Sequence, residues 1–135
     1  NIEEYRGKDA EIFFILFWVD RGTCGMSVIN VLSELHGKKI ALFGTCGMGR
    51  GAAYYREIEQ KVKVWIPDDC EYLGTFLCQG KMPMKVRQKY EISREDPREE
   101  AFRKQMLKNF DEALFHPNEQ DFVDARAFAK RLTEE

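Results

Sequence analysis

The most apolar stretch of the chain is residues 11–19, EIFFILFWV, which contains β-branched and aromatic residues without polar alternation. A short run of this kind predicts a strand that is buried on both faces, as the strands of parallel sheets are. Asp20, Arg21, Gly22 and Thr23 then break the run and predict a loop.

The same kind of signal alternates along residues 26–78. Apolar residues recur at helical spacing from Met26 to Leu35 and again from Tyr54 to Trp65 or Ile66, before Pro67. Short apolar runs at 38–44 and 70–78 predict two further strands, with Gly74 a candidate bulge in the second. The order strand, helix, strand, helix, strand predicts an α/β fold with a doubly wound parallel sheet.

Residues 81–135 have a different pattern. Pro97 opens one predicted helix and Asn118 caps a second, after a turn at residues 81–84. The predicted buried stripes are Phe102, Met106, Phe110, Ala113 and Leu114 in the first helix, and Phe122, Ala125, Ala129 and Leu132 in the second. We therefore expect an α/β core at residues 1–80 and a helical extension at 81–135 that packs on one sheet face of the same domain.

Composition narrows the functional class. The 135 residues are 44% apolar, enough for a core, and 21 Lys and Arg nearly balance 23 Asp and Glu. This balance argues against a nucleic-acid partner, and an apolar run of eight residues at 12–19 is too short to span a membrane. No secretory signal is present, and the cysteine usage described next leads us to expect a reducing, cytoplasmic setting. The chain starts with Asn1 rather than Met, which leaves open that it is part of something longer.

The four cysteines, at positions 24, 46, 70 and 78, form no CxxC pair, and only two histidines accompany them. This spacing argues against a zinc site, and a core of this size does not need a disulfide framework. Cys24 and Cys46 could still form a redox pair, although small buried packing residues are the commoner case.

Two loops are the candidate ligand site. In open α/β sheets ligands bind beyond the carboxyl ends of the strands, and the loops at 18–25 and 45–51 both leave strands at that edge. Their small residues let backbone N–H groups approach a ligand, and each loop precedes a helix N-terminus. Trp18 offers a flat surface on which a planar ring could stack, unless it belongs to the core.

The segments FWVDRGTCG, KKIALFGTCGMG and AAYYREI resemble the flavodoxin-like proteins. With LGTFLCQGKMP, they are most similar to a bacterial subgroup of flavodoxin family proteins, some of which are associated with bilirubin reduction. The likeness covers residues 1 to about 96 well and the helical tail more loosely. It implies the flavodoxin strand order 2-1-3-4-5 and a bound FMN whose ring lies between the two loops.

In this resemblance Trp18 stacks on the isoalloxazine, N–H groups from Asp20 to Thr23 contact N5 and O4, and those around Cys46 and Gly47 contact O2 and N1. Asp20 would disfavour an anionic reduced flavin and Arg21 would favour it. The implied cofactor-binding residues are Trp18, Val19, Asp20, Arg21, Gly22, Thr23 and Cys24 in the first loop, and Thr45, Cys46, Gly47, Met48 and Gly49 in the second.

The chain departs from the family pattern in one respect. The Thr-Gly-Asn-Thr phosphate loop is absent, and with it the first strand, the first helix and the second strand of the family. The strand at 11–19 would then have an unpaired apolar edge, which the missing part or another chain must cover. We therefore expect the full-length protein to bind FMN, and this portion alone to bind it weakly or not at all.

The predicted function is electron transfer through FMN, as a carrier or as the partner of a reductase, with a separate redox protein as donor or acceptor. A flavin-free interaction module with the same fold is the alternative, and a thiol-based redox protein using Cys24 and Cys46 is a third. A homo-oligomer is left open. Lys85, Arg87 and Lys89 could dock an acidic partner, although their charge-balanced surroundings favour plain solvation.

Overall fold

The computed structural model describes residues 10–48 and 51–134. Three parallel strands form one sheet in the order β1 (Ile12–Trp18), β2 (Lys39–Cys46) and β3 (Glu71–Gln79). Helices α1 (Met26–Glu34) and α2 (Ala52–Lys63) connect them. The predicted α/β fold with a parallel sheet is confirmed, and each predicted strand and helix in this part of the chain is present.

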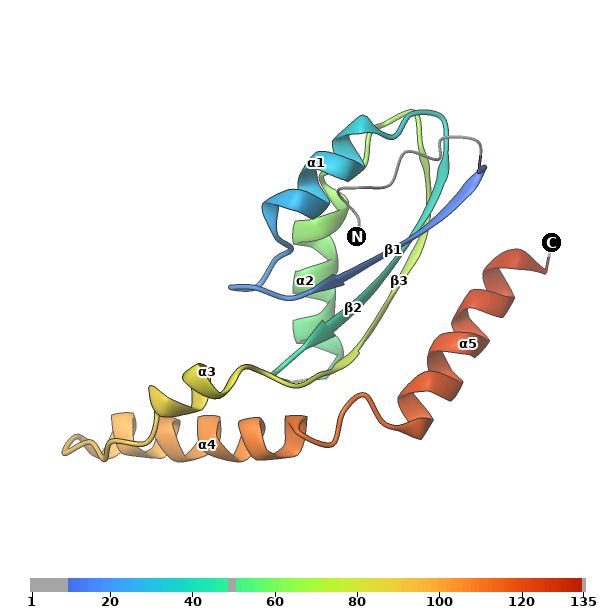
Figure 1. Cartoon of the computed structure of the whole chain (residues 1–135). Helices are drawn as coiled ribbons and strands as arrows, with labels where there is room; N and C mark the ends of the chain where they lie inside the picture. Colours follow the sequence, from blue (N-terminus) through green and yellow to red (C-terminus); the bar gives the residue numbers. More distant parts are fainter. Residues whose placement is uncertain (1–9, 49–50, 135) are drawn as a thin grey trace.

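The core lies between the sheet and α1 with α2, which cover the same face (Figure 1). Phe13, Ile15 and Phe17 of β1 point into it, together with residues of the two helices such as Leu32 and Ile58. Burying these large apolar side chains contributes about 1.5–3 kcal/mol each, so this face supplies most of the stability.

The prediction that the first strand is buried on both faces is wrong. Burial alternates along β1, and the side chains of Ile12, Phe14, Leu16 and Trp18 are exposed on the face opposite the core. These side chains are exposed because no helix in the described part of the chain packs over β1 on that face. The helix α5 (Glu119–Thr133) lies on the same face but contacts β3. Among the described residues β1 also has only β2 as a neighbouring strand.

The packing of α5 depends on one aromatic residue and one glycine. Phe128 packs against Phe43 and Phe76, with ring centroids 5.3 and 6.1 Å away, and lies over Gly74. Gly74 has φ 141°, and the pairing shifts by one residue between Ile40 and Ala41, so the predicted bulge is confirmed. The predicted stripe of α5 omitted Phe128, and none of its members is fully buried.

Helices α3 (Met84–Gln88) and α4 (Pro97–Ala113) lie against each other and project away from the sheet (Figure 1). We call residues 81–113 the α3–α4 arm. Asp96 caps α4 by accepting from the backbone N–H groups of Arg98 and Glu99, and Pro97 occupies its first turn. Met106, Phe110 and Ala113 are buried as predicted, but Phe102 and Leu114 are exposed. The division at residue 80 stays a prediction.

Candidate cofactor site

The two candidate loops lie side by side at the carboxyl end of the sheet. Trp18 is the register partner of Thr45, and the backbone N–H of Val19 donates to the Thr45 carbonyl at 2.8 Å. This hydrogen bond extends the ladder one residue beyond β1. The structure therefore brings together the two segments that the sequence analysis selected, Trp18 to Cys24 and Thr45 to Met48, while Gly49 lies outside the described residues.

The first loop is a tight turn. Asp20 and Thr23 exchange backbone hydrogen bonds of 2.7 and 3.1 Å, and both central residues have positive φ, 53° at Arg21 and 85° at Gly22. These are the features of a type I′ turn, which favours Asn, Asp or Gly at the first central position, so Arg21 is strained there. Because the N–H groups of Asp20 and Thr23 are engaged within the turn, those of Arg21 and Gly22 are the ones left for a ligand. The Arg21 guanidinium is exposed 4.0 Å from the Asp20 carboxylate, so the two charges partly offset each other.

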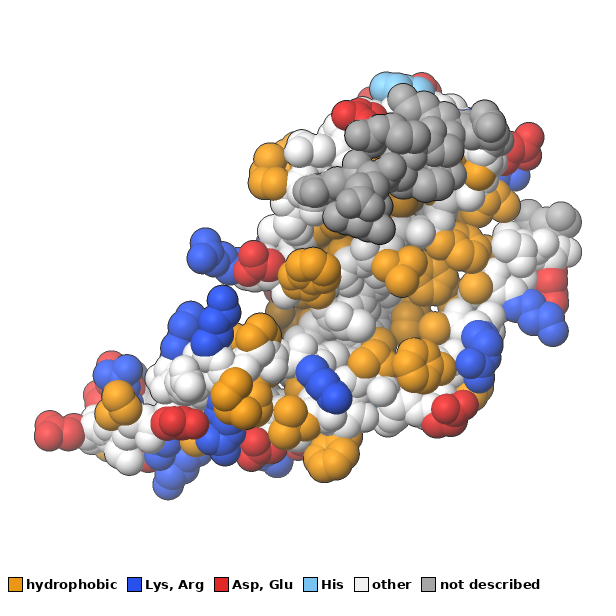
Figure 2. All heavy atoms as spheres, viewed as in Figure 1, with side chains coloured by type: hydrophobic (Ala, Val, Ile, Leu, Met, Phe, Trp, Pro, Cys, Tyr) orange, Lys and Arg blue, Asp and Glu red, His pale blue; other side chains and the backbone are white. Residues whose placement is uncertain are grey.

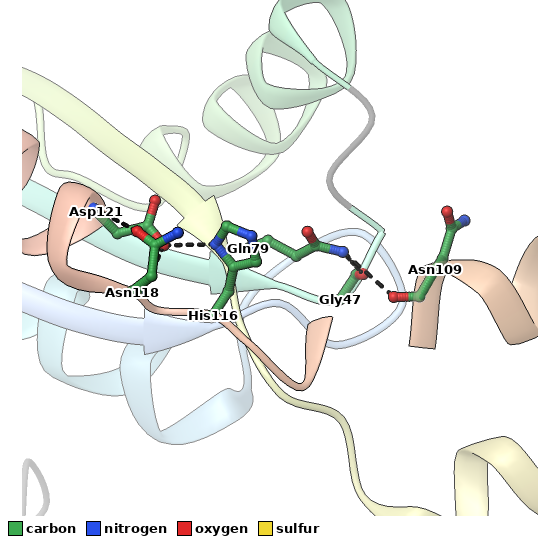
Figure 3. A network of polar contacts seen from close by, with 6 residues as sticks. All are labelled: Gly47, Gln79, Asn109, His116, Asn118 and Asp121. Carbon is green, nitrogen blue, oxygen red and sulfur yellow. Dashed lines mark hydrogen bonds and ion pairs between the residues drawn. The ribbon is translucent and has the colours of Figure 1, made fainter. Parts of the chain in front are cut away.

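The second loop is held by the segment that follows β3. Gly80 donates its N–H to the Cys46 carbonyl at 2.9 Å, and the Gln79 amide donates to the Gly47 carbonyl at 2.9 Å. The same Gln79 nitrogen lies 3.4 Å from the Asn109 carbonyl, so it joins the loop to α4 (Figure 3). Met82 fills the space beside Gly47, where a Cβ would meet its Sδ at 2.2 Å. These contacts fix Cys46 and Gly47 before any ligand arrives.

Trp18 is not a core residue, since its side chain is 75% exposed. It stands at the edge of a groove of about 420 Å³ between the uncovered face of the sheet and α5. The groove is lined by Leu16, Phe17, Trp18, Phe43, Gly44, Thr45, Phe76, Cys78, Pro117, Asp121, Phe122 and Ala125. Figure 2 shows hydrophobic side chains gathered around this hollow. Asp121 is its single charged residue, so the surface suits a planar or apolar group.

The thiols at the site are packing residues. Cys24 and Cys46 are buried in the core cluster, and none of the four cysteines forms a disulfide with another. Burial raises the pKa of the Cys24 thiol, and burial followed by the nearby Asp121 and Cys46 raises that of Cys78 to about 11. Because the thiolate is the reactive form, a raised pKa leaves Cys24 and Cys78 without the activation that redox cysteines have. This finding argues against the thiol-based alternative.

A polar cluster that the sequence analysis did not select lies at the N-terminus of α5 (Figure 3). His116 Nδ1 is 2.6 Å from an Asp121 oxygen, which also accepts the Asn118 N–H at 2.8 Å. Asn118 in turn accepts the Asp121 N–H, which completes a capping box. The spacing of Asn118 and Asp121 signalled the helix start, but nothing local showed that His116 joins them beside the groove.

The chemistry available to this arrangement is binding. The loops offer N–H groups to an electron-rich ring edge, and Trp18 offers a face for stacking. No group of three metal-ligating side chains occurs within residues 10–48 and 51–134. No helix in that part of the chain is long and apolar enough to cross a membrane.

Comparisons with known proteins identify the family. A model of the flavodoxin domain matches residues 1–130. The flavodoxin-like domain-containing protein BilS of Clostridioides difficile (strain CD3) is 42% identical over 126 residues, which cover 93% of this chain and 71% of that protein. The BilS protein of Clostridium symbiosum (strain WAL-14163) is 33% identical over 129 residues, covering 91% of this chain and 67% of that protein. The resemblance predicted from the two loops is confirmed at this level: the chain belongs to the flavodoxin domain family.

Proposed function

We propose that this chain supplies the ring-binding part of an FMN site in a flavodoxin-like protein that transfers electrons, as a carrier or as a reductase component. The observation that carries the proposal is the exposed Trp18 indole beside two loops that the Val19–Thr45 hydrogen bond holds together. A large aromatic side chain that is three-quarters exposed at a carboxyl sheet edge costs solubility, and stacking on a planar ligand would offset that cost.

The residues fit the isoalloxazine at its polar edge as well as its face. In the first loop the N–H groups of Arg21 and Gly22 would donate to the ring, and the turn presents them without rearrangement because Asp20 and Thr23 already close it. In the second loop the N–H groups around Cys46 and Gly47 would bind the pyrimidine edge. The bound flavin would supply the redox chemistry, since it accepts electrons in pairs or singly, and the protein positions it and excludes water.

The phosphate of FMN needs a further binding element. The chain contains no Thr-Gly-Asn-Thr phosphate loop, and among residues 10–48 and 51–134 one face and one edge of β1 stay uncovered, where additional structure would pack. We propose that the full-length protein binds FMN and that these 135 residues alone bind it weakly or not at all. Either a redox protein or a small substrate at the flavin edge would then complete the electron transfer.

The alternative, a flavin-free interaction module, is favoured by one contact. Met82 occupies the space beside Gly47 that the resemblance assigns to the approach of a ligand, so this side of the second loop faces protein. In an interaction module the two loops would serve the stability of the fold and would bind no cofactor.

A visible absorption spectrum of the purified full-length protein, recorded with and without added FMN, separates the two functions. Electron transfer through FMN predicts a flavin spectrum that shifts on binding, together with quenched flavin fluorescence. A colourless protein whose melting temperature does not rise on addition of FMN would favour the interaction module.

A further inference from the structure

Over its whole length the α3–α4 arm carries nine Lys and Arg against seven Asp and Glu, and its excess of positive charge lies in residues 81–108. From Lys81 to Lys108, nine Lys and Arg stand against five Asp and Glu, which gives this segment a formal charge of +4 within a chain of −2. The remainder of the chain therefore carries −6. Figure 2 shows blue side chains over α3 and α4, interleaved with hydrophobic and red ones.

Three of the acidic residues in this segment are already engaged. Glu100 accepts two hydrogen bonds from Arg103, Glu91 pairs with Arg87, and Asp96 caps α4. The side chains of Lys89, Arg94 and Arg98 make no ion pair within the described residues. The sequence favoured plain solvation because the charges in this region nearly balance. The contacts show that the side chains of Lys89, Arg94 and Arg98 nevertheless have no acidic partner among the described residues.

These cations line a hollow of about 450 Å³ between the α3–α4 connection and the start of α4. Tyr90 and Phe102 form its aromatic wall, with ring centroids 6.2 Å apart in an edge-to-face arrangement, and Glu99 is its one carboxylate. Arg103 fixes the shape, because it donates to the Tyr90 carbonyl at 2.8 Å while it holds Glu100. The hollow is thus preformed, which reduces the ordering cost of binding.

The arm is also fixed relative to the candidate cofactor loops. Gln79 lies within hydrogen-bonding distance of the carbonyls of Gly47 and Asn109, and Met82 packs on Gly47. The hollow lies at the other end of α4 from Asn109 (Figure 1), so a protein docked in it would have to reach along the arm to meet the sheet edge where the flavin ring would be exposed.

We propose that the hollow formed by Lys89, Tyr90, Arg94, Arg98 and Phe102 docks an acidic segment on the surface of a partner protein. That the partner is the electron donor or acceptor rests on the proposed function; the acidic chemistry rests on the charges alone. A long polyanion fits less well, because the net charge of −6 on the chain outside residues 81–108 would repel whatever extends beyond that segment.

The test uses the full-length protein and a fluorescein-labelled oligoglutamate peptide, with binding followed by fluorescence anisotropy at low and physiological salt. Arg94→Glu/Arg98→Glu reverses two exposed charges, and Glu at the second position of α4 suits the helix N-terminus, so folding is preserved. The matched control is Arg56→Glu/Lys61→Glu, the same change of charge on exposed positions of α2. We expect affinity to fall about tenfold in the arm variant only, and to weaken with salt in the wild type.

The proposal is overturned if both variants lose affinity equally or if the wild type does not bind the peptide. It is also overturned if single-stranded DNA or phosphatidylserine vesicles bind as tightly with the same sensitivity, or if the arm variant abolishes self-association, which would assign the surface to a second copy. The FMN spectrum of each sample is recorded in parallel. If the protein binds the peptide but not FMN, the proposed function is wrong and the docking surface stands. If it binds FMN but not the peptide, the docking surface is wrong and the proposed function stands.

Discussion

Met82 and Gly47 are in contact so close that a Cβ on the glycine would lie 2.2 Å from the methionine Sδ. These residues stand 35 positions apart, yet this contact sets the position of the second candidate loop. Only glycine leaves the space that Met82 fills, so the requirement at position 47 is one of room for a neighbour.

Gly47→Ala is expected to lower the free energy of unfolding by about 1–2 kcal/mol, because Met82 must leave its place. Met82→Ala makes room for the new methyl group, so the same glycine substitution in that background should cost clearly less. Urea denaturation of the four proteins in this cycle measures the difference. Equal costs in both backgrounds would show that the contact does not constrain the loop.

Asp121→Ala is expected to cost about 1–2 kcal/mol of stability, because it removes both the capping box with Asn118 and the contact with His116. Asp124→Ala, on an exposed position of the same helix where the side chain accepts only from Gln120, serves as control and should cost less than about 0.5 kcal/mol. The same denaturation experiment applies. Similar losses of stability at the two positions would show that Asp121 does not stabilise the start of α5.

The Glu100–Arg103 pair makes the arm acid-sensitive. Hydrogen bonds from Arg103, and then from the Arg94 N–H, lower the pKa of Glu100 from 4.5 to about 2. Because the folded pKa is the lower one, its stabilisation is present above the unfolded pKa and lost as pH falls towards 2. Glu100→Gln should therefore lower the melting temperature at neutral pH and flatten its decline below about pH 5. Glu99→Gln is the control, and an identical acid profile in both variants would contradict the prediction.

Thiol labelling tests whether the cysteines are packing residues. In the native protein, iodoacetamide at neutral pH should modify the half-buried Cys70 first, while Cys24, Cys46 and Cys78 react slowly. Burial accounts for the slow reaction, and the raised pKa of Cys24 and Cys78 adds to it. Mass spectrometry of the digested protein identifies the labelled sites. Rapid labelling of Cys46, or its recovery in a disulfide with Cys24, would restore the thiol-based alternative.

The sequence predicted the elements better than their surroundings. Apolar runs located the three described strands, and helical spacing located the helices between them. Glycine at position 74 marked the bulge. The same runs could not show that Phe14 and Leu16 face an uncovered side of the sheet, because an apolar run reports composition and not what packs on it. For the same reason Phe128 was missed in α5 although it makes the main contacts with β2 and β3.

The parts of the candidate site that neighbouring residues form could be predicted from the sequence. The parts that distant segments bring together could not. Both loops follow strands, so strand order alone placed Asp20 and Cys46 at one edge. The closure of the first turn, which engages the N–H groups of Asp20 and Thr23, depends on backbone angles that composition only hints at. That His116 lies beside Asp121 and the groove could not be predicted from the sequence, because it depends on how the chain runs between distant elements in three dimensions.

The most direct test of the account is the affinity of the full-length protein for FMN, measured by quenching of flavin fluorescence, in Trp18→Ala and Trp65→Ala. Both tryptophans are exposed, but Trp18 lies at the candidate loops and Trp65 at the end of α2. If the flavin ring stacks on Trp18, its removal should raise the dissociation constant about tenfold while Trp65→Ala leaves it unchanged. Unchanged affinity in Trp18→Ala would contradict the proposed ring site, and no FMN binding in the wild type would contradict the proposed function.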